Sequence, residues 1–179
     1  MAQRDFRDDE HFVRLCSRQK QIREHDGTLR GVTWEAFSLR TNIKEDYLSG
    51  ALLEHFQGTQ REQAVAAVEA MKSAGMVFSD KHAVAVCSAG SIRGCGTKQK
   101  RKLRVRHEPN KKNASYSKVR GLPLDNSDNE LLSLLAADSV VSCTCVIELR
   151  PAALDAVPQL PEESQDAAPQ PPEGQIPQQ

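Results

Sequence analysis

Aromatic side chains are scarce in this 179-residue sequence, which has 5 Phe, 2 Tyr and 1 Trp, or 4% of its residues. A core built mainly on large aromatic rings is therefore excluded, and Ala, Val, Leu and Ile must supply most of the buried apolar surface. Long apolar runs are also missing, because no stretch approaches the roughly 20 residues that a membrane-spanning helix needs. The charged start, MAQRDFRDDEHF, lacks the apolar region of a secretory signal. We expect a soluble, cytoplasmic protein with no membrane partner.

Cysteines and histidines with metal-ligand spacing are missing as well. The 5 Cys form an odd, scattered set, which argues against a secreted disulfide framework: Cys16, Cys87, Cys95, Cys143 and Cys145. Cys143 and Cys145 would share one face of a strand, but a CxC spacing alone is a weak zinc signal, and two buried small hydrophobes are the better interpretation. The 5 His share no ligand spacing either. We therefore predict no metal site and no cofactor.

Proline gathers at the C-terminal end of the chain. Residues 151–179 hold seven of the nine prolines, together with Gln, Glu and Ala, and hardly any large apolar side chain. Such a segment cannot bury enough apolar surface to offset the entropy lost on ordering. The sequence therefore predicts a single domain over residues 1–150 and a disordered Pro/Gln/acidic tail over residues 151–179.

Short strand patterns alternate with helix patterns without a regular βαβ rhythm. Alternating or β-branched residues predict five strands: Phe12–Cys16, Val32–Leu39, Ala83–Cys87, Leu103–His107 and Val140–Leu149. The polar stretch between the first two contains Asp26-Gly27, which predicts a hairpin-type turn.

Helical spacing appears first in Tyr47–Phe56, where Leu48, Leu52 and Phe56 stand at i, i+4 and i+8. Cap residues mark two further helices: Thr59 with Glu62 begins one that ends at Gly75, and Ser127 begins another over Asn129–Ala137. The sequence therefore predicts the α+β class, with two or three helices packed on a mixed sheet.

Charge is distributed unevenly, although the formal net charge is zero. Eleven basic residues between Ile92 and Arg120 stand against Glu108 alone, which gives that segment a charge of +10. From Gly121 onward ten acidic residues stand against Arg150, which gives −9. The two parts of the chain can therefore attract each other, and the tail is a candidate competitor for whatever the basic segment binds.

The basic segment is the strongest candidate for binding. Its cations can neutralise phosphates: Lys98, Lys100, Arg101, Lys102, Arg104, Arg106, Lys111 and Lys112. Tyr116 adds a ring on which a base can stack. The alternative is a solvated strand edge that lysines protect against pairing. We expect a non-enzymatic accessory or adaptor domain that binds a partner protein or a polyanion such as nucleic acid.

Two other patterns bear on chemistry. Ser88–Gly96 follows a predicted strand and contains three glycines, but it has neither the Walker spacing nor the GxGxxG fingerprint, so it predicts a flexible loop. His11 and His107 lie at strand ends, where side chains can project into a cleft, and they are candidate catalytic residues.

A different enzyme candidate combines Arg14, Tyr47, Ser49 and Glu54. Their placement loosely resembles that of the NAD-binding ADP-ribosyl-transferase-like toxins, including the RES-domain type. The resemblance covers about a quarter of the chain and implies an NAD-dependent enzyme. The alternative for these four residues is ordinary packing, with Glu54 facing water.

Three segments, FVRLC, AFSLRTNIKEDYLSGALLEHF and HEPNKKNASYSKVRGLP, resemble small uncharacterised bacterial proteins of conflict-system or mobile-element gene cassettes. The resemblance covers about half the chain. Ala114 and Tyr116 stand where that family pattern has Pro and His, which weakens a catalytic role for the second histidine. The resemblance implies a component of a bacterial multi-component system, such as a defence system, with a protein partner from the same system. It implies no particular reaction.

Overall fold

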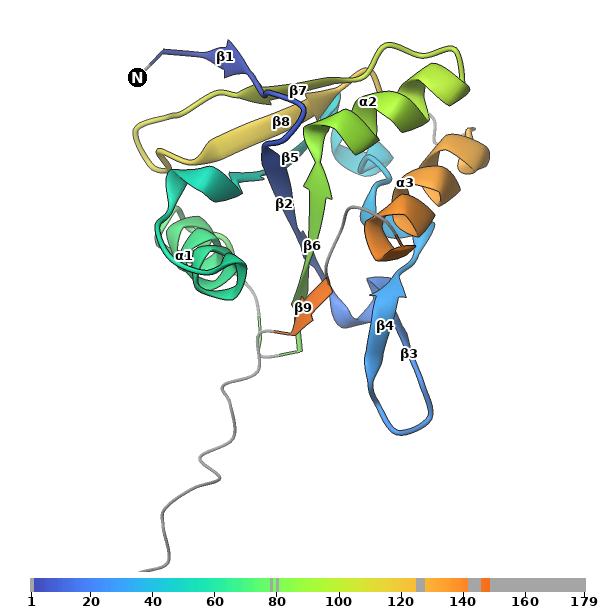
Figure 1. The fold of residues 1–179 in the computed structure, drawn as a ribbon, viewed down its shortest axis with the longest axis horizontal. Coiled ribbons are helices and arrows are strands. Elements are labelled where there is room, and N and C mark those ends of the chain that lie inside the picture. Colours follow the sequence, from blue (N-terminus) through green and yellow to red (C-terminus); the bar gives the residue numbers. More distant parts are fainter. Residues whose placement is uncertain (1, 78, 80, 125–127, 142–145, 149–179) are drawn as a thin grey trace, which may run out of the picture.

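The computed structural model describes residues 2–77, 79, 81–124, 128–141 and 146–148 (Figure 1). Three α-helices pack on a large antiparallel sheet, so the predicted α+β class is confirmed. No helix in these ranges is long and apolar enough to cross a membrane. The predicted tail, residues 151–179, lies outside the described residues.

The large sheet has seven strands, and every described pairing in it is antiparallel rather than mixed. In spatial order the strands are β1 (Arg4–Asp5), β7 (Arg104–His107), β8 (Tyr116–Arg120), β5 (Tyr47–Leu52), β2 (His11–Cys16), β6 (Ala83–Ser88) and β9 (Val146–Glu148). A separate hairpin joins β3 (Gln21–Arg23) to β4 (Leu29–Val32). Gly27, with a φ of 86°, supplies the left-handed residue of its turn, which confirms the prediction from Asp26-Gly27.

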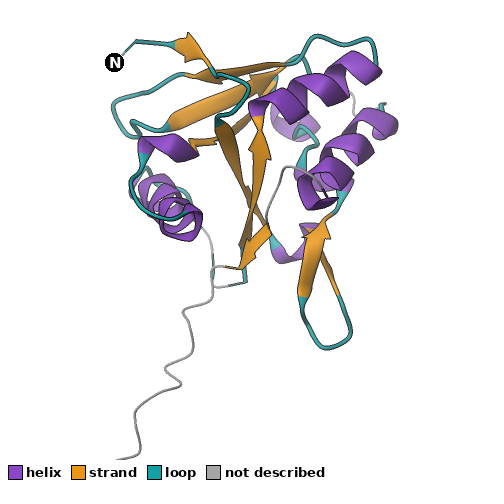
Figure 2. Ribbon diagram, in the orientation of Figure 1, coloured by secondary structure: helices purple, strands orange, loops and turns teal. Residues whose placement is uncertain are grey.

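Helices cover both faces of the sheet (Figures 1 and 2). Helix α1 (Gln60–Ser73) packs on β2, β5 and the short 3₁₀ turn η4 (Leu53–His55). Helices α2 (Ala89–Lys98) and α3 (Asn129–Val141) pack on each other and on the opposite face, together with the 3₁₀ turn η2 (Trp34–Ala36). Two further 3₁₀ turns are η1 (Arg18–Lys20) and η3 (Thr41–Ile43).

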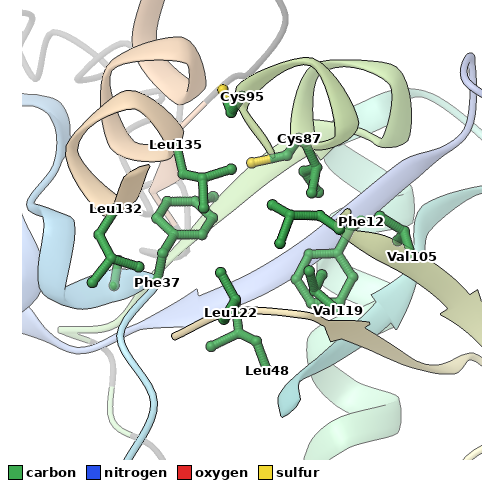
Figure 3. Packing of buried hydrophobic residues seen from close by; sticks show 14 of the residues in the cluster. Phe12, Phe37, Leu48, Cys87, Cys95, Val105, Val119, Leu122, Leu132 and Leu135 are labelled. Carbon is green, nitrogen blue, oxygen red and sulfur yellow. The ribbon is translucent and has the colours of Figure 1, made fainter. Parts of the chain in front are cut away.

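Two apolar cores form as a result, one on each face of the sheet. Strand β2 contributes to both, because alternate side chains of a strand point to opposite faces. Phe12 enters the larger core, to which Leu48, Val119 and Leu135 also belong (Figure 3). Val13 enters the smaller core under α1. Strand β2 therefore holds the two layers of the protein together.

The predicted helix starts are reproduced by specific caps. The capping box before α1 is complete, since Glu62 N–H donates to Thr59 Oγ1 and Thr59 N–H donates to Glu62 Oε2 at 2.7 Å. Gly75, with a φ of 96°, follows the end of α1 as predicted. At α3, Asp128 Oδ1 accepts from Leu131 N–H at 3.0 Å, and the predicted cap Ser127 lies outside the described residues.

Three of the predicted elements are wrong. Tyr47–Phe56 is strand β5 followed by η4 rather than a helix, because Tyr47 to Leu52 pairs with β8 along most of its length and with β2 near its end. Val32–Leu39 is not a strand, since β4 ends at Val32 and η2 follows. Ser88–Gly96 is not a flexible loop but the cap and body of α2, where Ser88 Oγ accepts from Ser91 N–H at 3.1 Å. In each case cross-strand pairing or a cap outweighed the local pattern.

The C-terminal strand prediction is met only in part. Helix α3 continues through Val141, so the start of the predicted strand Val140–Leu149 is helical. Strand β9 covers Val146–Glu148 and pairs with β6. Cys143 and Cys145 lie outside the described residues. Strand β8 was not predicted at all, although the structure pairs it with both β5 and β7.

The ladder between β2 and β5 is short and crowded. It consists of two register pairs, Phe12 with Leu52 and Val13 with Ala51, whereas β2 pairs with β6 along all of its residues. Gly50 lies directly against this ladder. A Cβ atom at Gly50 would fall inside van der Waals contact with the Val13 carbonyl oxygen and the Phe12 ring, and neither the backbone nor the buried ring can move aside easily.

We predict that Gly50→Ala lowers the free energy of unfolding by about 3 kcal/mol, because overpacking at this site displaces the β2 backbone or the Phe12 ring. The measurement is the midpoint of urea unfolding. Gly94→Ala is the matched control. A Cβ at Gly94 meets open space on the exposed side of α2, so this change should stabilise the protein by about 1 kcal/mol. Equal effects of the two substitutions would contradict the packing argument.

Candidate functional site

The predicted basic segment is divided between two places in the fold. Lys98 ends α2, Lys100 and Lys102 lie in the turn that follows, and Arg104 begins β7. Lys111 and Lys112 lie in the connection from β7 to β8, at the opposite end of β7. All six side chains are exposed. We call the first group, Lys98, Lys100, Lys102 and Arg104, the α2–β7 basic corner.

Ion pairs separate the cations of this segment into two classes. Several are neutralised by carboxylates: Arg93 by Asp8, Arg101 by Asp128, Arg106 by Asp5, Lys118 by Glu108, and Arg120 by Asp46 and Glu108. The four residues of the α2–β7 basic corner, Lys111 and Lys112 have no carboxylate partner in the described part of the chain. Of the eight residues of the predicted polyanion-binding set, Arg101 and Arg106 are thus engaged in ion pairs, and the other six have none within the described residues.

A hollow of about 330 Å³ lies at the α2–β7 basic corner. Arg93, Arg101, Lys102 and Arg104 line it, with Asp5 as its acidic residue. Arg101 is fixed there because its Nε donates to Asp128 Oδ2 at 2.9 Å. The corner is therefore a concave surface of net positive charge, a shape that suits a phosphate group better than a flat array of lysines does.

Two tyrosines and two cations share one face of β5 and β8. The register pairs Tyr47 with Arg120 and Ser49 with Lys118, so these side chains lie on the same side of the sheet. Lys118 Nζ lies 4.1 Å from the centroid of the Tyr47 ring and 5.6 Å from that of Tyr116. Burial, and next a hydrogen bond with Tyr47, raise the pKa of Tyr116 above its usual value. The rings are held by these contacts, and Lys118 partly covers them.

The residues of the NAD-dependent alternative are only partly brought together. Arg14 Nη1 donates to the Ser49 carbonyl oxygen at 2.7 Å and lies 3.4 Å from Ser49 Oγ. Tyr47 lies on the same strand as Ser49 but contacts Lys118 and Arg120. The Glu54 carboxylate is held by His11 at the other end of β2. Arg14 and Ser49 thus form one site, and Glu54 belongs to another.

His11 and Glu54 form a partly exposed ion pair. His11 Nδ1 lies 2.6 Å from Glu54 Oε1, and the His11 backbone N–H also donates to the carboxylate. The hydrogen bond to Glu54 raises the pKa of His11 above its usual value of 6.5. Burial opposes ionisation of Glu54, but the bonds from His11 outweigh it and lower the pKa of Glu54.

The second candidate histidine lies apart from this pair. His107 is buried, and its Nε2 lies 2.8 Å from the Ala114 carbonyl oxygen. Its ring centroid lies 6.2 Å from that of His55, and no described contact joins it to His11. The two candidate histidines therefore do not form one catalytic centre in the described residues.

The described residues contain neither a reactive thiol nor a metal-binding cluster. Cys16, Cys87 and Cys95 are buried, and burial raises the pKa of Cys16 to about 11. A thiol of that kind is poorly nucleophilic at neutral pH. Within these ranges no group of three or more His, Cys, Asp or Glu side chains is placed to hold a metal ion.

Sequence reasoning missed a second cationic group. Lys20 and Arg40 line a hollow together with Arg14, although the three residues are spread over β2, η1 and the segment before η3. No spacing in the sequence relates them. The alternation of Tyr116, Lys118 and Arg120 with buried Ser117 and Val119 was, in contrast, a strand signal that the sequence did contain.

We predict that Glu54→Gln lowers the pKa of His11, measured by the pH dependence of the imidazole resonances in NMR spectra. Because the folded-state pKa of His11 is raised, its stabilisation is complete below 6.5 and is lost as the pH rises through the folded-state pKa. The pH dependence of unfolding in that window should therefore weaken in Glu54→Gln. Glu69→Gln, on the exposed side of α1, is the control. An unchanged His11 titration in Glu54→Gln would show that the pair does not persist in solution.

Comparison with known proteins identifies no relative of this chain. No family model, curated protein or solved structure matches the chain. The resemblance to bacterial gene-cassette proteins therefore stays a prediction from the sequence.

Proposed function

We propose that this protein is a non-enzymatic accessory domain that binds a polyanion, with nucleic acid as the leading class, through the α2–β7 basic corner. The observation that carries the proposal is the set of exposed cations without carboxylate partners in the described residues. They stand beside a hollow that Arg93 and Arg101 also line. The bacterial multi-component setting, and a protein partner from the same system, rest on the sequence resemblance alone.

Electrostatics favours a phosphate backbone as the ligand of this corner. Each phosphate that a lysine or arginine neutralises releases condensed counterions, so affinity falls steeply with salt. The internal ion pairs of Arg93 and Arg101 keep those side chains in place beside the free cations. The preformed geometry reduces the entropy lost on binding. Lys111 and Lys112, at the other end of β7, extend the positive surface for a longer strand.

The test is salt-dependent retention on heparin and on single-stranded DNA. The variant Lys98→Gln/Lys102→Gln/Arg104→Gln spares the Arg101 to Asp128 pair and the left-handed backbone at Lys100, whose φ is 54°. On a single strand, we expect the slope of log affinity against log salt to fall by about 0.7 for each phosphate that the variant no longer neutralises. Arg18→Gln/Arg61→Gln/Lys72→Gln removes the same charge elsewhere on the surface and serves as the control.

Two results would remove the proposal. One is the absence of retention at low salt by the wild-type protein. The other is an equal loss in both triple variants, because net charge rather than the corner would then explain binding.

The geometry supports binding better than the NAD-dependent alternative. That alternative needs Arg14, Ser49 and Glu54 around one ligand, whereas the Glu54 carboxylate is bonded to His11. We expect incubation with labelled NAD to give neither turnover nor a modified product. Release of nicotinamide above the rate of an Arg14→Lys variant, measured by chromatography, would reverse this conclusion.

A further inference from the structure

A second basic hollow lies where β2 separates from β5. It has a volume of about 230 Å³. Its polar lining comes from Arg14, Ser17, Lys20, Arg40, Ser49 and His82. This hollow belongs neither to the α2–β7 basic corner nor to the His11 and Glu54 pair. Its cations come from β2, η1 and the segment before η3.

Arg14 is partly buried and has no carboxylate partner in the described residues. Its Nε donates to the Ala36 carbonyl oxygen at 3.3 Å, and Nη1 donates to that of Ser49. Nη2 makes no hydrogen bond within the described residues. Every fully buried side-chain nitrogen or oxygen in these residues has a hydrogen-bond partner, so Nη2 cannot be fully buried. Because Arg14 lines the hollow, we infer that Nη2 is accessible from it. Two carbonyl groups hold the guanidinium in place, and among the described residues nothing accepts from its remaining edge.

Lys20 brings a second positive charge to the same hollow. Its ammonium group makes no ion pair or hydrogen bond within the described ranges. Burial, and next the charge of Arg14, lower the pKa of Lys20. Burial likewise lowers the pKa of Arg14. Two cations that repel each other and have lost part of their hydration are unfavourable unless an anion joins them.

The described carboxylates that attract Arg14 and Lys20 make their hydrogen bonds to other groups. Glu45 accepts from the backbone N–H and the guanidinium of Arg40. Glu35 accepts from the Thr33 hydroxyl. Both act on Arg14 or Lys20 only through longer-range attraction. The hollow thus keeps a positive charge that these side chains do not neutralise.

An apolar groove continues from this hollow. It has a volume of about 340 Å³ and shares Ser49, Met71 and Met76 with the basic hollow. Its other walls include Lys112, Tyr116, Asn110 and Asn113. A basic hollow that leads into a mostly apolar groove, with an aromatic ring, two asparagines and one lysine in its walls, fits a ligand with an anionic group and a larger, mainly uncharged organic part.

We propose that the hollow binds a phosphate monoester, with the phosphate at Arg14 and Lys20 and the organic group in the groove beside Met71, Met76 and Tyr116. A dianion matches the two cations better than a carboxylate does. The planar guanidinium suits phosphate oxygens, and the hydroxyls of Ser17 and Ser49 add further donors. The phosphate belongs either to a free metabolite or to the end of a nucleic-acid strand. This site is independent of the α2–β7 basic corner.

The test is isothermal titration calorimetry of the full chain with phenyl phosphate, inorganic phosphate and phenol. We expect saturable binding of phenyl phosphate, weaker binding of inorganic phosphate and no binding of phenol. Lys20→Gln should weaken phenyl phosphate binding about tenfold, the effect of losing one charge-assisted hydrogen bond. Arg18→Gln, on the same 3₁₀ turn but outside the hollow, should leave affinity unchanged.

A second variant protects the test against misfolding and locates the organic group. Met76→Ala, at an exposed position, should weaken phenyl phosphate but not inorganic phosphate. Uridine 5′-monophosphate, and an oligonucleotide with and without a 5′-phosphate, distinguish the two sources of phosphate. Preference for the free nucleotide supports a metabolite, and a gain from the 5′-phosphate supports a strand end.

The proposal is overturned if phenyl phosphate shows no saturable binding, or if Lys20→Gln and Arg18→Gln weaken it equally. Its outcome is separable from that of the polyanion surface. The triple variant of the α2–β7 basic corner should bind phenyl phosphate as the wild type does. Lys20→Gln should, in turn, keep its retention on heparin. A loss of both activities in either variant would show that the two sites are not independent.

Discussion

The two-pair ladder between β2 and β5 is the constraint on which the rest of the structure depends. It joins β1, β7, β8 and β5 to β2, β6 and β9, so one sheet is continuous only because Phe12 and Val13 meet Leu52 and Ala51. Gly50 permits the close approach, since any larger residue would meet the Phe12 ring. Beyond Val13 the strands separate, and Arg14 spans the gap with a bond to the Ser49 carbonyl oxygen. The same separation that shortens the ladder leaves room for the second basic hollow.

Carboxylates determine which cations remain available. Asp128 has two partners, because it caps α3 at Leu131 and binds Arg101 beside the α2–β7 basic corner. Glu108 lies among Arg106, Lys118 and Arg120 on the sheet face. These acids neutralise Arg101 and the cations of β7 and β8, whereas the exposed lysines at the end of α2 and in the connections on either side of β7 have no carboxylate partner in the described residues. A net charge of zero over the chain therefore coexists with two concentrated positive surfaces.

Caps, turns and short alternating patterns were predicted correctly from the sequence, because each depends on residues that are close together along the chain. The Thr59 and Glu62 capping box, the Asp26-Gly27 turn and the alternation of Arg104 to His107 each appear as expected. Tyr47–Phe56 was mistaken for a helix because its leucines fit a period of 3.6, and only the pairing with β8 and β2 shows that the period of two applies. The run of basic residues in the sequence predicted the basic segment, but it did not show which of these residues form ion pairs within the fold. The hollow at Arg14, Lys20 and Arg40 depends on contacts between distant segments, which spacing does not encode.

The order of the strands also bears on how another molecule can approach. Strand β1, at one edge of the described sheet, has two residues, and both are charged. Strand β9, at the other described edge, has three residues. Short or charged edges give an incoming extended peptide few backbone groups to pair with. Strand addition at these two edges is therefore disfavoured, and so is the joining of neighbouring copies edge to edge there.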